Sequence, residues 1–203
     1  MEKFVWQKHG FGTRQANPPA DVSLRQVHSA CVRDSDGLAD REAEGNALVT
    51  AKPGRSIGVR TADCVPLLLL DAQTRAVAAI HAGWRGTAAR IAGETVKKLT
   101  EGYGTDAEQV YAAIGPCIRA CCYEVSPDVA ERFREWPESV VVSGSGKPRL
   151  DLAGVNRNQL IAAGVPPLQI FDCGLCTFCL PDQFFSFRRE PENPGRMLSA
   201  ICR

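Results

Sequence analysis

The chain has 203 residues, of which 44% are hydrophobic and 23% are charged. This length fits one sizeable buried core and is short for two. Its 24 Lys and Arg residues against 23 Asp and Glu residues leave a formal net charge of +1, so no global positive field attracts nucleic acid. The longest strongly apolar run, residues 65–70, is far shorter than the roughly 20 residues that cross a bilayer. Met1-Glu2-Lys3 leads into no signal-peptide apolar region. We therefore expect a single domain over residues 1–203, cytoplasmic and monomeric, without affinity for nucleic acid or membrane.

Short apolar or β-branched runs predict strands along the whole chain. The turn at Asp71-Ala72-Gln73-Thr74 predicts a hairpin between strands at 65–71 and 76–81. We expect these two strands and the preceding strand at 56–61 to be adjacent. The predicted strands are Ser56–Thr61, Val65–Asp71, 76–81, Val110–Ile114, 140–143, 168–172, 184–188 and 197–201, and we expect the core to begin at the apolar run 47–50.

Three segments predict helices between these strands. Apolar residues at spacings of three and four run from Ala88 to Leu99, and the helix ends at Gly102. Ser126 and Pro127 begin a second helix that runs to about Glu135, and Asp151 caps a third that breaks at Gly164. Grouped strands with hairpin links predict an α+β fold of mixed β-sheet layers with packed helices.

Cysteine is unusually frequent, with nine residues against three histidines. Without an export signal, such thiols are more often reduced, catalytic or metal-bound than paired in disulfides. Three imidazoles are too few for a multi-copper centre, because imidazole is the preferred copper ligand.

His28, Cys64 and His81 each stand at the end of an apolar segment, and they form the first candidate site. Two imidazoles and a thiolate suit zinc with one open coordination position. The same residues also fit a Cys–His pair in which Cys64 is the nucleophile, or two satisfied histidines beside a buried thiol.

Polar residues next to this set indicate an anion site. Arg60, Asp63 and Arg85 flank it, and Gly83 and Gly86 expose backbone amides where a helix begins. Each charged residue taken singly also fits a surface ion pair or a turn cap.

A second candidate is the C-x2-C-x2-C run of Cys173, Cys176 and Cys179, which resembles the start of an iron–sulfur motif without its fourth cysteine. A distant ligand from Cys117, Cys121, Cys122 or Cys202 would complete a structural zinc site or cluster. We favour thiols that merely pack.

In the predicted strand at 184–188, Phe185 and Phe187 share one face and fill the core, while Arg188 lies on the other. The Arg188 guanidinium then reaches either a phosphate or carboxylate in a pocket, or water.

Taken together, these segments resemble the bacterial laccase-like multicopper polyphenol oxidase domain proteins, also described as purine nucleoside phosphorylases and peptidoglycan editing factors. The resemblance covers nearly the whole chain. It rests on RQVH (25–28), RTADC (60–64), HAGWRG (81–86), IGPCI (114–118), CYEV (122–125), LDL (150–152), FSFRR (185–189) and GR (195–196).

The resemblance implies a mixed α/β sandwich in which His28, Cys64 and His81 hold a catalytic metal, usually zinc, with copper bound in vitro. It implies phosphorolysis of adenosine, inosine, guanosine and methylthioadenosine, with deamination of adenosine at the same site. The implied catalytic residues are His28, Cys64, His81 and the proton carrier Asp63. The implied substrate-binding residues are Arg60, Arg85, Arg188, Arg14 and Cys117. Arg14 comes from a matching GFGTR segment (10–14), although residues 15–19 replace the stretch that ordinarily follows it.

Two other classes of function stay open. The first is a cysteine-dependent amide hydrolase that edits cell-wall precursors, which iodoacetamide would inactivate and chelators would not. The second is a redox or partner-binding module based on Cys173 to Cys179. Oxidation of polyphenols would reflect adventitious copper.

Overall fold

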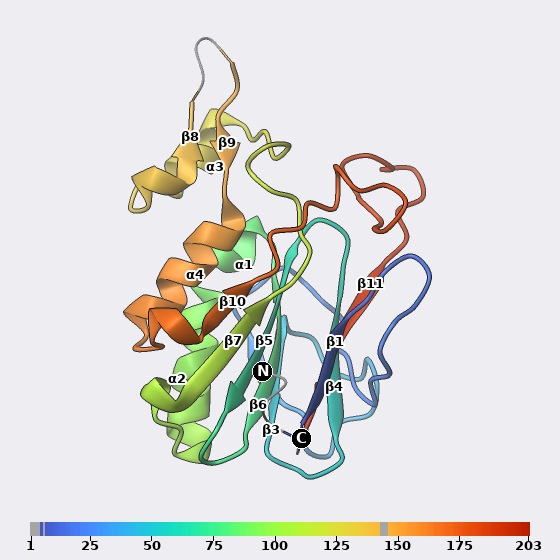
Figure 1. The fold of residues 1–203 in the computed structure, drawn as a ribbon, viewed down its shortest axis with the longest axis vertical. Helices are drawn as coiled ribbons and strands as arrows, with labels where there is room; N and C mark the ends of the chain where they lie inside the picture. The colour runs from blue at the N-terminus through green and yellow to red at the C-terminus, as the bar shows by residue number, and fades with distance from the viewer. Residues whose placement is uncertain (1–4, 6, 143–145) are drawn as a thin grey trace.

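The computed structural model describes residue 5 and residues 7–142 and 146–203. Figure 1 shows helices α1, α2 and α4 on one side of a large sheet and a smaller sheet on its other side. The fold is thus a mixed α/β arrangement of three layers, as the sequence predicts.

The central layer is a six-stranded sheet in the order β10-β7-β5-β6-β3-β2. Its inner pairs are antiparallel, whereas β10 runs parallel to β7 and β2 runs parallel to β3. The strands are β2 (Val32–Asp34), β3 (Ala47–Thr50), β5 (Val65–Asp71), β6 (Val77–Ala82), β7 (Val110–Ile114) and β10 (Ile170–Asp172).

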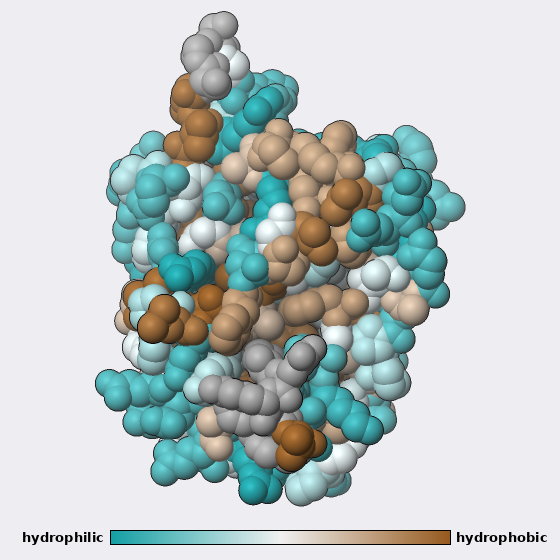
Figure 2. All heavy atoms as spheres, viewed as in Figure 1, coloured by the Kyte–Doolittle hydropathy of each residue, from teal (hydrophilic) through white to brown (hydrophobic). Residues whose placement is uncertain are grey.

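The smaller sheet is antiparallel, with the order β1-β11-β4. It consists of β1 (Lys8–Phe11), β4 (Ser56–Thr61) and β11 (Met197–Cys202). A separate hairpin pairs β8 (Val140–Val141) with β9 (Arg149–Leu150). Figure 2 shows apolar atoms near the outer end of this hairpin, where Val141 and Val142 are exposed.

The sequence of β5 explains the layering. All seven of its residues are buried, because alternate side chains of a strand point to opposite faces and both faces are covered. Leu67 and Leu69 belong to the core beneath the helices, and Leu68 and Leu70 belong to the core beneath the small sheet. Each buried leucine contributes about 1.5 to 3 kcal/mol, so β5 anchors both cores.

Three helices cover the outer face of the large sheet: α1 (Trp84–Ala88), α2 (Ile91–Tyr103) and α4 (Leu152–Ala162). Helix α3 (Pro127–Glu131) lies beside the β8–β9 hairpin in Figure 1, and short 3-10 turns occur at Ala107–Gln109, Pro137–Ser139 and Pro167–Gln169. Asp151 caps α4 as predicted, since its side chain accepts a hydrogen bond from the Gly154 amide. No helix in the described ranges combines the length and the hydropathy that a membrane span requires.

Several predicted boundaries shift. The helix expected to begin at Ala88 is divided into α1 and α2 at Arg90, whose φ of 60° interrupts the helical backbone. Helix α2 ends at Gly104 (φ 68°), beyond the expected Gly102. Helix α3 ends at Glu131, and tighter turns continue to Trp136. Of the strand predicted at 140–143, β8 retains Val140–Val141, and Ser143 lies outside the described residues.

Two strand predictions were wrong. The β4 strand does not pair with β5, because it pairs with β11 in the smaller sheet. Residues 184–186 are irregular and residues 187–188 begin a turn, in place of the predicted strand, since the Asp63 carboxylate binds the Arg188 backbone amide and the Ser186 hydroxyl. Consequently Phe184 is buried, whereas Phe187 is 52% exposed and does not fill the core.

Candidate active site and metal centre

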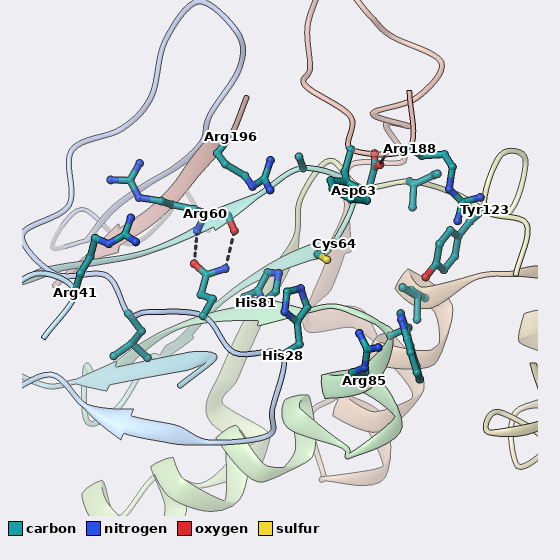
Figure 3. A pocket seen from close by; sticks show the side chains of 17 residues that line it. His28, Arg41, Arg60, Asp63, Cys64, His81, Arg85, Tyr123, Arg188 and Arg196 are labelled. Atoms are coloured by element: carbon teal, nitrogen blue, oxygen red, sulfur yellow. Dashed lines mark hydrogen bonds between the residues drawn. The ribbon is translucent and has the colours of Figure 1, made fainter. Parts of the chain in front are cut away.

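The structure brings His28, Cys64 and His81 together at one end of the large sheet. His81 is on β6, Cys64 directly precedes β5, and His28 lies in the loop between β1 and β2. One potential ligand atom from each residue lies within 4.8 Å of the other two. Figure 3 shows the three side chains pointing toward one another at the base of a cavity.

Asn46 positions both histidines. Its side-chain oxygen accepts hydrogen bonds from the backbone amides of Val27 (3.2 Å) and Ser29 (2.9 Å), which bracket His28. This contact holds His28 in its left-handed conformation, with a φ of 56°. The amide nitrogen of Asn46 lies 2.6 Å from Nδ1 of His81 and fixes the orientation of that ring. Sequence reasoning missed Asn46, although an asparagine directly before the apolar run 47–50 is a signal that could have found it.

The surroundings keep both imidazoles neutral. Burial, the neighbouring His28 and Arg196 lower the pKa of His81 to about 3. Burial and the charges of Arg85 and Arg196 also lower the pKa of His28 below its usual value. Neutral imidazole is the form that binds a metal, so both rings can act as ligands at neutral pH.

The pKa of the Cys64 thiol shifts upward, in contrast to the pKa values of the two histidines. Burial and the negative charge of Asp63 raise the pKa of its thiol to about 12. The residue is therefore a protonated thiol at neutral pH and a poor nucleophile. A divalent metal would displace this proton, because metals bind the thiolate.

The residues present fit a zinc ion. Two nitrogen donors and one sulfur donor form a typical catalytic zinc set with one open position. Gly83 lines the same space without a side chain, and a Cβ atom there would come within 3.0 Å of the Cys64 sulfur and 3.2 Å of His28 Cδ2. The absence of a side chain at Gly83 therefore preserves room beside the three donors.

Asp63 is held as a hydrogen-bond acceptor. Its carboxylate accepts from the Thr177 hydroxyl (2.7 Å), the Ser186 hydroxyl (3.0 Å) and the Arg188 amide (2.7 Å). It is buried and adopts a φ of 81°. Asp63 thus joins the turn before Cys64 to the segment that contains Arg188.

The donors lie in a cavity of about 580 Å³. Five arginines line it, and none of them forms an ion pair with a carboxylate in the described part of the chain. Figure 3 shows them in two groups on opposite sides of the histidines. The first group is Arg41, Arg60 and Arg196, and the second is Arg85 and Arg188. Positive groups gathered around a concave space attract anions.

The Gln26 side chain holds the backbone of Arg60 in place. The Gln26 side chain donates to the Arg60 carbonyl (2.7 Å) and accepts from its amide (2.8 Å), as the dashed lines in Figure 3 show. Sequence reasoning singled out Arg60, Arg85 and Arg188 but missed Arg41 and Arg196. Both of these lie outside regular elements, where a charged residue has no distinguishing sequence pattern.

Aromatic side chains supply an apolar wall. Trp84, Tyr123 and Phe187 line the cavity. The Arg85 guanidinium lies 4.4 Å from the centre of the Trp84 ring, and that of Arg188 lies 5.2 Å from the centre of the Tyr123 ring. Such a wall suits a flat aromatic ligand held beside an anion.

Two expected binding residues lie elsewhere. Cys117 is completely buried in the core and is not among the described residues that line the cavity. Arg14 also lies outside that lining: it pairs with Glu190, donates to the Phe184 carbonyl (3.1 Å) and covers the Phe185 ring at 4.4 Å. In this structure Arg14 therefore supports the segment at 184–190.

Known proteins are similar to this chain in sequence and in fold. A purine nucleoside phosphorylase from Bacteroides thetaiotaomicron is 42% identical over 161 residues, which are 77% of this chain and 60% of that protein. An adenosine deaminase from an unknown prokaryotic organism is 41% identical over 196 residues, or 90% of this chain and 74% of that protein. The crystal structure of the Bacillus licheniformis hypothetical protein YfiH has a TM-score of 0.91 and 29% identity, covering 99% of this chain and 94% of that one.

A family model extends over nearly the whole sequence. The model described as multi-copper polyphenol oxidoreductase laccase matches residues 9–203, and this range contains all of the site residues described above. The chain therefore belongs to the multi-copper polyphenol oxidoreductase laccase family.

Proposed function

We propose that this chain is a zinc-dependent purine nucleoside phosphorylase, which cleaves adenosine, inosine, guanosine and methylthioadenosine with phosphate. One observation carries the proposal: the donors His28, Cys64 and His81 lie at the base of a cavity lined by five arginines that pair with no carboxylate among the described residues. An anion site and an aromatic wall in one cavity are what phosphorolysis of a purine nucleoside requires, and the three metal donors lie in the same cavity. The names of relatives such as the Bacteroides phosphorylase support this choice.

The arginines bind the phosphate. A guanidinium forms paired, charge-assisted hydrogen bonds with phosphate oxygens, and Arg60 is held for this role by Gln26. As the glycosidic bond breaks, positive charge develops on the ribose and negative charge on the base. A phosphate held by the arginines can then attack the sugar carbon.

The aromatic wall and Tyr123 receive the purine. Trp84 and Phe187 offer flat surfaces for stacking. Burial and the nearby Cys64 raise the pKa of Tyr123 to about 12, so its hydroxyl keeps its proton. It can therefore donate a hydrogen bond to the purine as the base becomes negative.

His28, Cys64 and His81 would hold the zinc ion, which when bound supplies a Lewis acid and activates water near neutral pH. Asn46 fixes the backbone around His28 and the imidazole of His81 before the metal arrives. We assign Asp63 a positioning role, because its carboxylate accepts three hydrogen bonds that orient the turn before Cys64. The sequence had suggested a proton carrier at this position.

Deamination of adenosine is the second candidate activity at this site. Its support is the 41% identity to an adenosine deaminase over 90% of this chain, together with the same three donors. This activity needs water but no phosphate, so its product distinguishes it from phosphorolysis.

The remaining alternatives have weaker support. A Cys64 hydrolase requires an accessible thiolate, whereas burial raises the pKa of this thiol to about 12. Oxidation of polyphenols by several copper ions requires more imidazoles than the two present here, and His9 is on β1 in the smaller sheet.

The test incubates zinc-loaded protein with inosine or adenosine, with and without phosphate, and identifies the products by chromatography. We expect free base and ribose phosphate from both nucleosides only when phosphate is present. Inosine formed from adenosine without phosphate would establish the second activity. Intact nucleosides under every condition would contradict the proposal. An amide-cleaving activity that iodoacetamide abolishes and chelators leave unchanged would favour the hydrolase.

A further inference from the structure

A second group of metal-binding side chains lies outside the cavity. The sulfur atoms of Cys121, Cys122, Cys176 and Cys179 all lie within 4.8 Å of one another. The Cys179 sulfur is 3.8 Å from that of Cys121 and 3.3 Å from that of Cys122. The sequence pattern drew attention to Cys173, Cys176 and Cys179, but Cys173 is not a member of this group.

These distances match a single tetrahedral metal ion. Zinc–thiolate bonds are about 2.3 Å long, which places neighbouring sulfur atoms of a tetrahedral site roughly 3.8 Å apart. An iron–sulfur cluster separates its cysteine sulfurs more widely, because an inorganic core lies between them. A tetrahedron of four thiolates is therefore a site for zinc.

The turn between Cys176 and Cys179 is held in place by other contacts. The Thr177 amide donates to the Cys117 carbonyl at 3.0 Å. The Arg189 guanidinium donates to the carbonyls of Thr177 (2.8 Å) and Phe178 (2.9 Å). The cysteines of this turn are thus preorganised for a ligand, which reduces the entropy lost on binding.

We propose that Cys121, Cys122, Cys176 and Cys179 bind one structural zinc ion that joins the loop after β7 to the loop after β10. Figure 1 shows these two segments, yellow-green and orange-red, side by side above the sheet. The site is separate from His28, Cys64 and His81, and it does not depend on the proposed nucleoside chemistry.

The position of this zinc ion gives it a role in shaping the cavity. The first loop supplies Ile118 and Tyr123 to the cavity lining, and the second supplies Phe187 and Arg188. Thr177, which follows Cys176, binds the Asp63 carboxylate at 2.7 Å. Zinc at the four cysteines therefore fixes both the wall of the cavity and the turn before Cys64.

Elemental analysis of purified protein variants tests the proposal. We expect about two zinc ions per chain in the unmodified protein and about one in Cys179→Ser or Cys64→Ser, since each substitution removes a ligand from one site. Cys173→Ser is the matched control, because this exposed cysteine belongs to the same sequence run but not to the group, and it should keep both ions. Unchanged zinc content in Cys179→Ser, or a metal-free Cys64→Ser protein, would overturn the proposal.

A second measurement covers the case in which Cys179→Ser does not fold. Cobalt(II) added to Cys64→Ser protein from which zinc has been removed should give the strong sulfur-to-metal charge-transfer absorption of a tetrathiolate site. Zinc should abolish this absorption and should protect four thiols from alkylation in the native protein. A metal-free chain whose mass is lower by two hydrogen atoms for each disulfide would show that these cysteines are oxidised in pairs. This result would refute a metal site.

Discussion

Replacing Asn46 with alanine should weaken zinc binding and destabilise the fold together. The side-chain oxygen of Asn46 satisfies the amides of Val27 and Ser29, and its nitrogen orients His81. Alanine removes these three contacts and leaves space in a completely buried position. Each lost hydrogen bond costs about 1 kcal/mol, so the free energy of unfolding should fall by about 3 kcal/mol.

The two effects are measurable separately. In a domain of this size, a loss of about 3 kcal/mol lowers the melting temperature by about 6 to 12 °C. Loss of a group that orients metal ligands typically weakens metal affinity about 10- to 100-fold. Differential scanning calorimetry of the metal-free protein gives the first quantity, and competition with a chromophoric chelator gives the second.

Asn158→Ala provides the control. Asn158 forms a single side-chain hydrogen bond at the surface, to Glu138 at 2.8 Å. Its loss should change stability by less than about 0.5 kcal/mol and leave zinc affinity unchanged. Wild-type zinc affinity in Asn46→Ala would show that the two imidazoles reach their positions without this amide, and it would refute the reasoning.

Three further predictions concern the same cavity. Gly83→Ala should weaken zinc binding, because the new methyl group lies 3.0 Å from the Cys64 sulfur. The control Gly93→Ala in α2 meets no atom within 4 Å, so it should bind zinc normally and stabilise the helix by about 0.5 to 1 kcal/mol. Equal zinc affinities of the two variants in isothermal titration would contradict this prediction. Zinc affinity should rise about tenfold per pH unit near neutrality. The Cys64 thiol has a pKa of about 12 and must lose one proton when zinc binds, whereas His81 has a pKa of about 3 and loses none. A pH-independent affinity would exclude Cys64 as a ligand. Arg60→Gln should raise the KM for phosphate about 10- to 100-fold. Lys97→Gln makes the same charge change at an exposed side chain of α2 and should leave this KM unchanged. Equal KM values for the two variants would show that Arg60 does not bind phosphate.

Much of the core could be predicted from local patterns. The run at β5 and the hairpin to β6 depend on neighbouring residues, and both occur as expected. The cap of α4 at Asp151 is equally local. The pairing of β4 with β11 could not be foreseen, because the contacts that turn the chain between the two sheets at Asp63 come from Thr177 and Ser186, 114 and 123 residues away.

The candidate site shows the same division. His28, Cys64 and His81 could be selected because each ends an apolar segment, and strand ends bring such residues together. Arg41 and Arg196 could not, because a charged residue in a loop is usually a solvated one and only the folded cavity shows otherwise. The four-cysteine group joins adjacent cysteines in one loop to a C-x2-C turn more than 50 residues later, and local spacing does not show which cysteines meet.

Zinc content and phosphate-dependent cleavage of inosine, measured on the same sample of Cys64→Ser protein, test the central claim most directly. We expect one zinc ion fewer than in the unmodified protein, no release of hypoxanthine, and an unchanged circular dichroism spectrum, because the substitution removes a metal ligand and leaves the core intact. Full phosphorolysis by Cys64→Ser protein that has lost this zinc ion would contradict this claim.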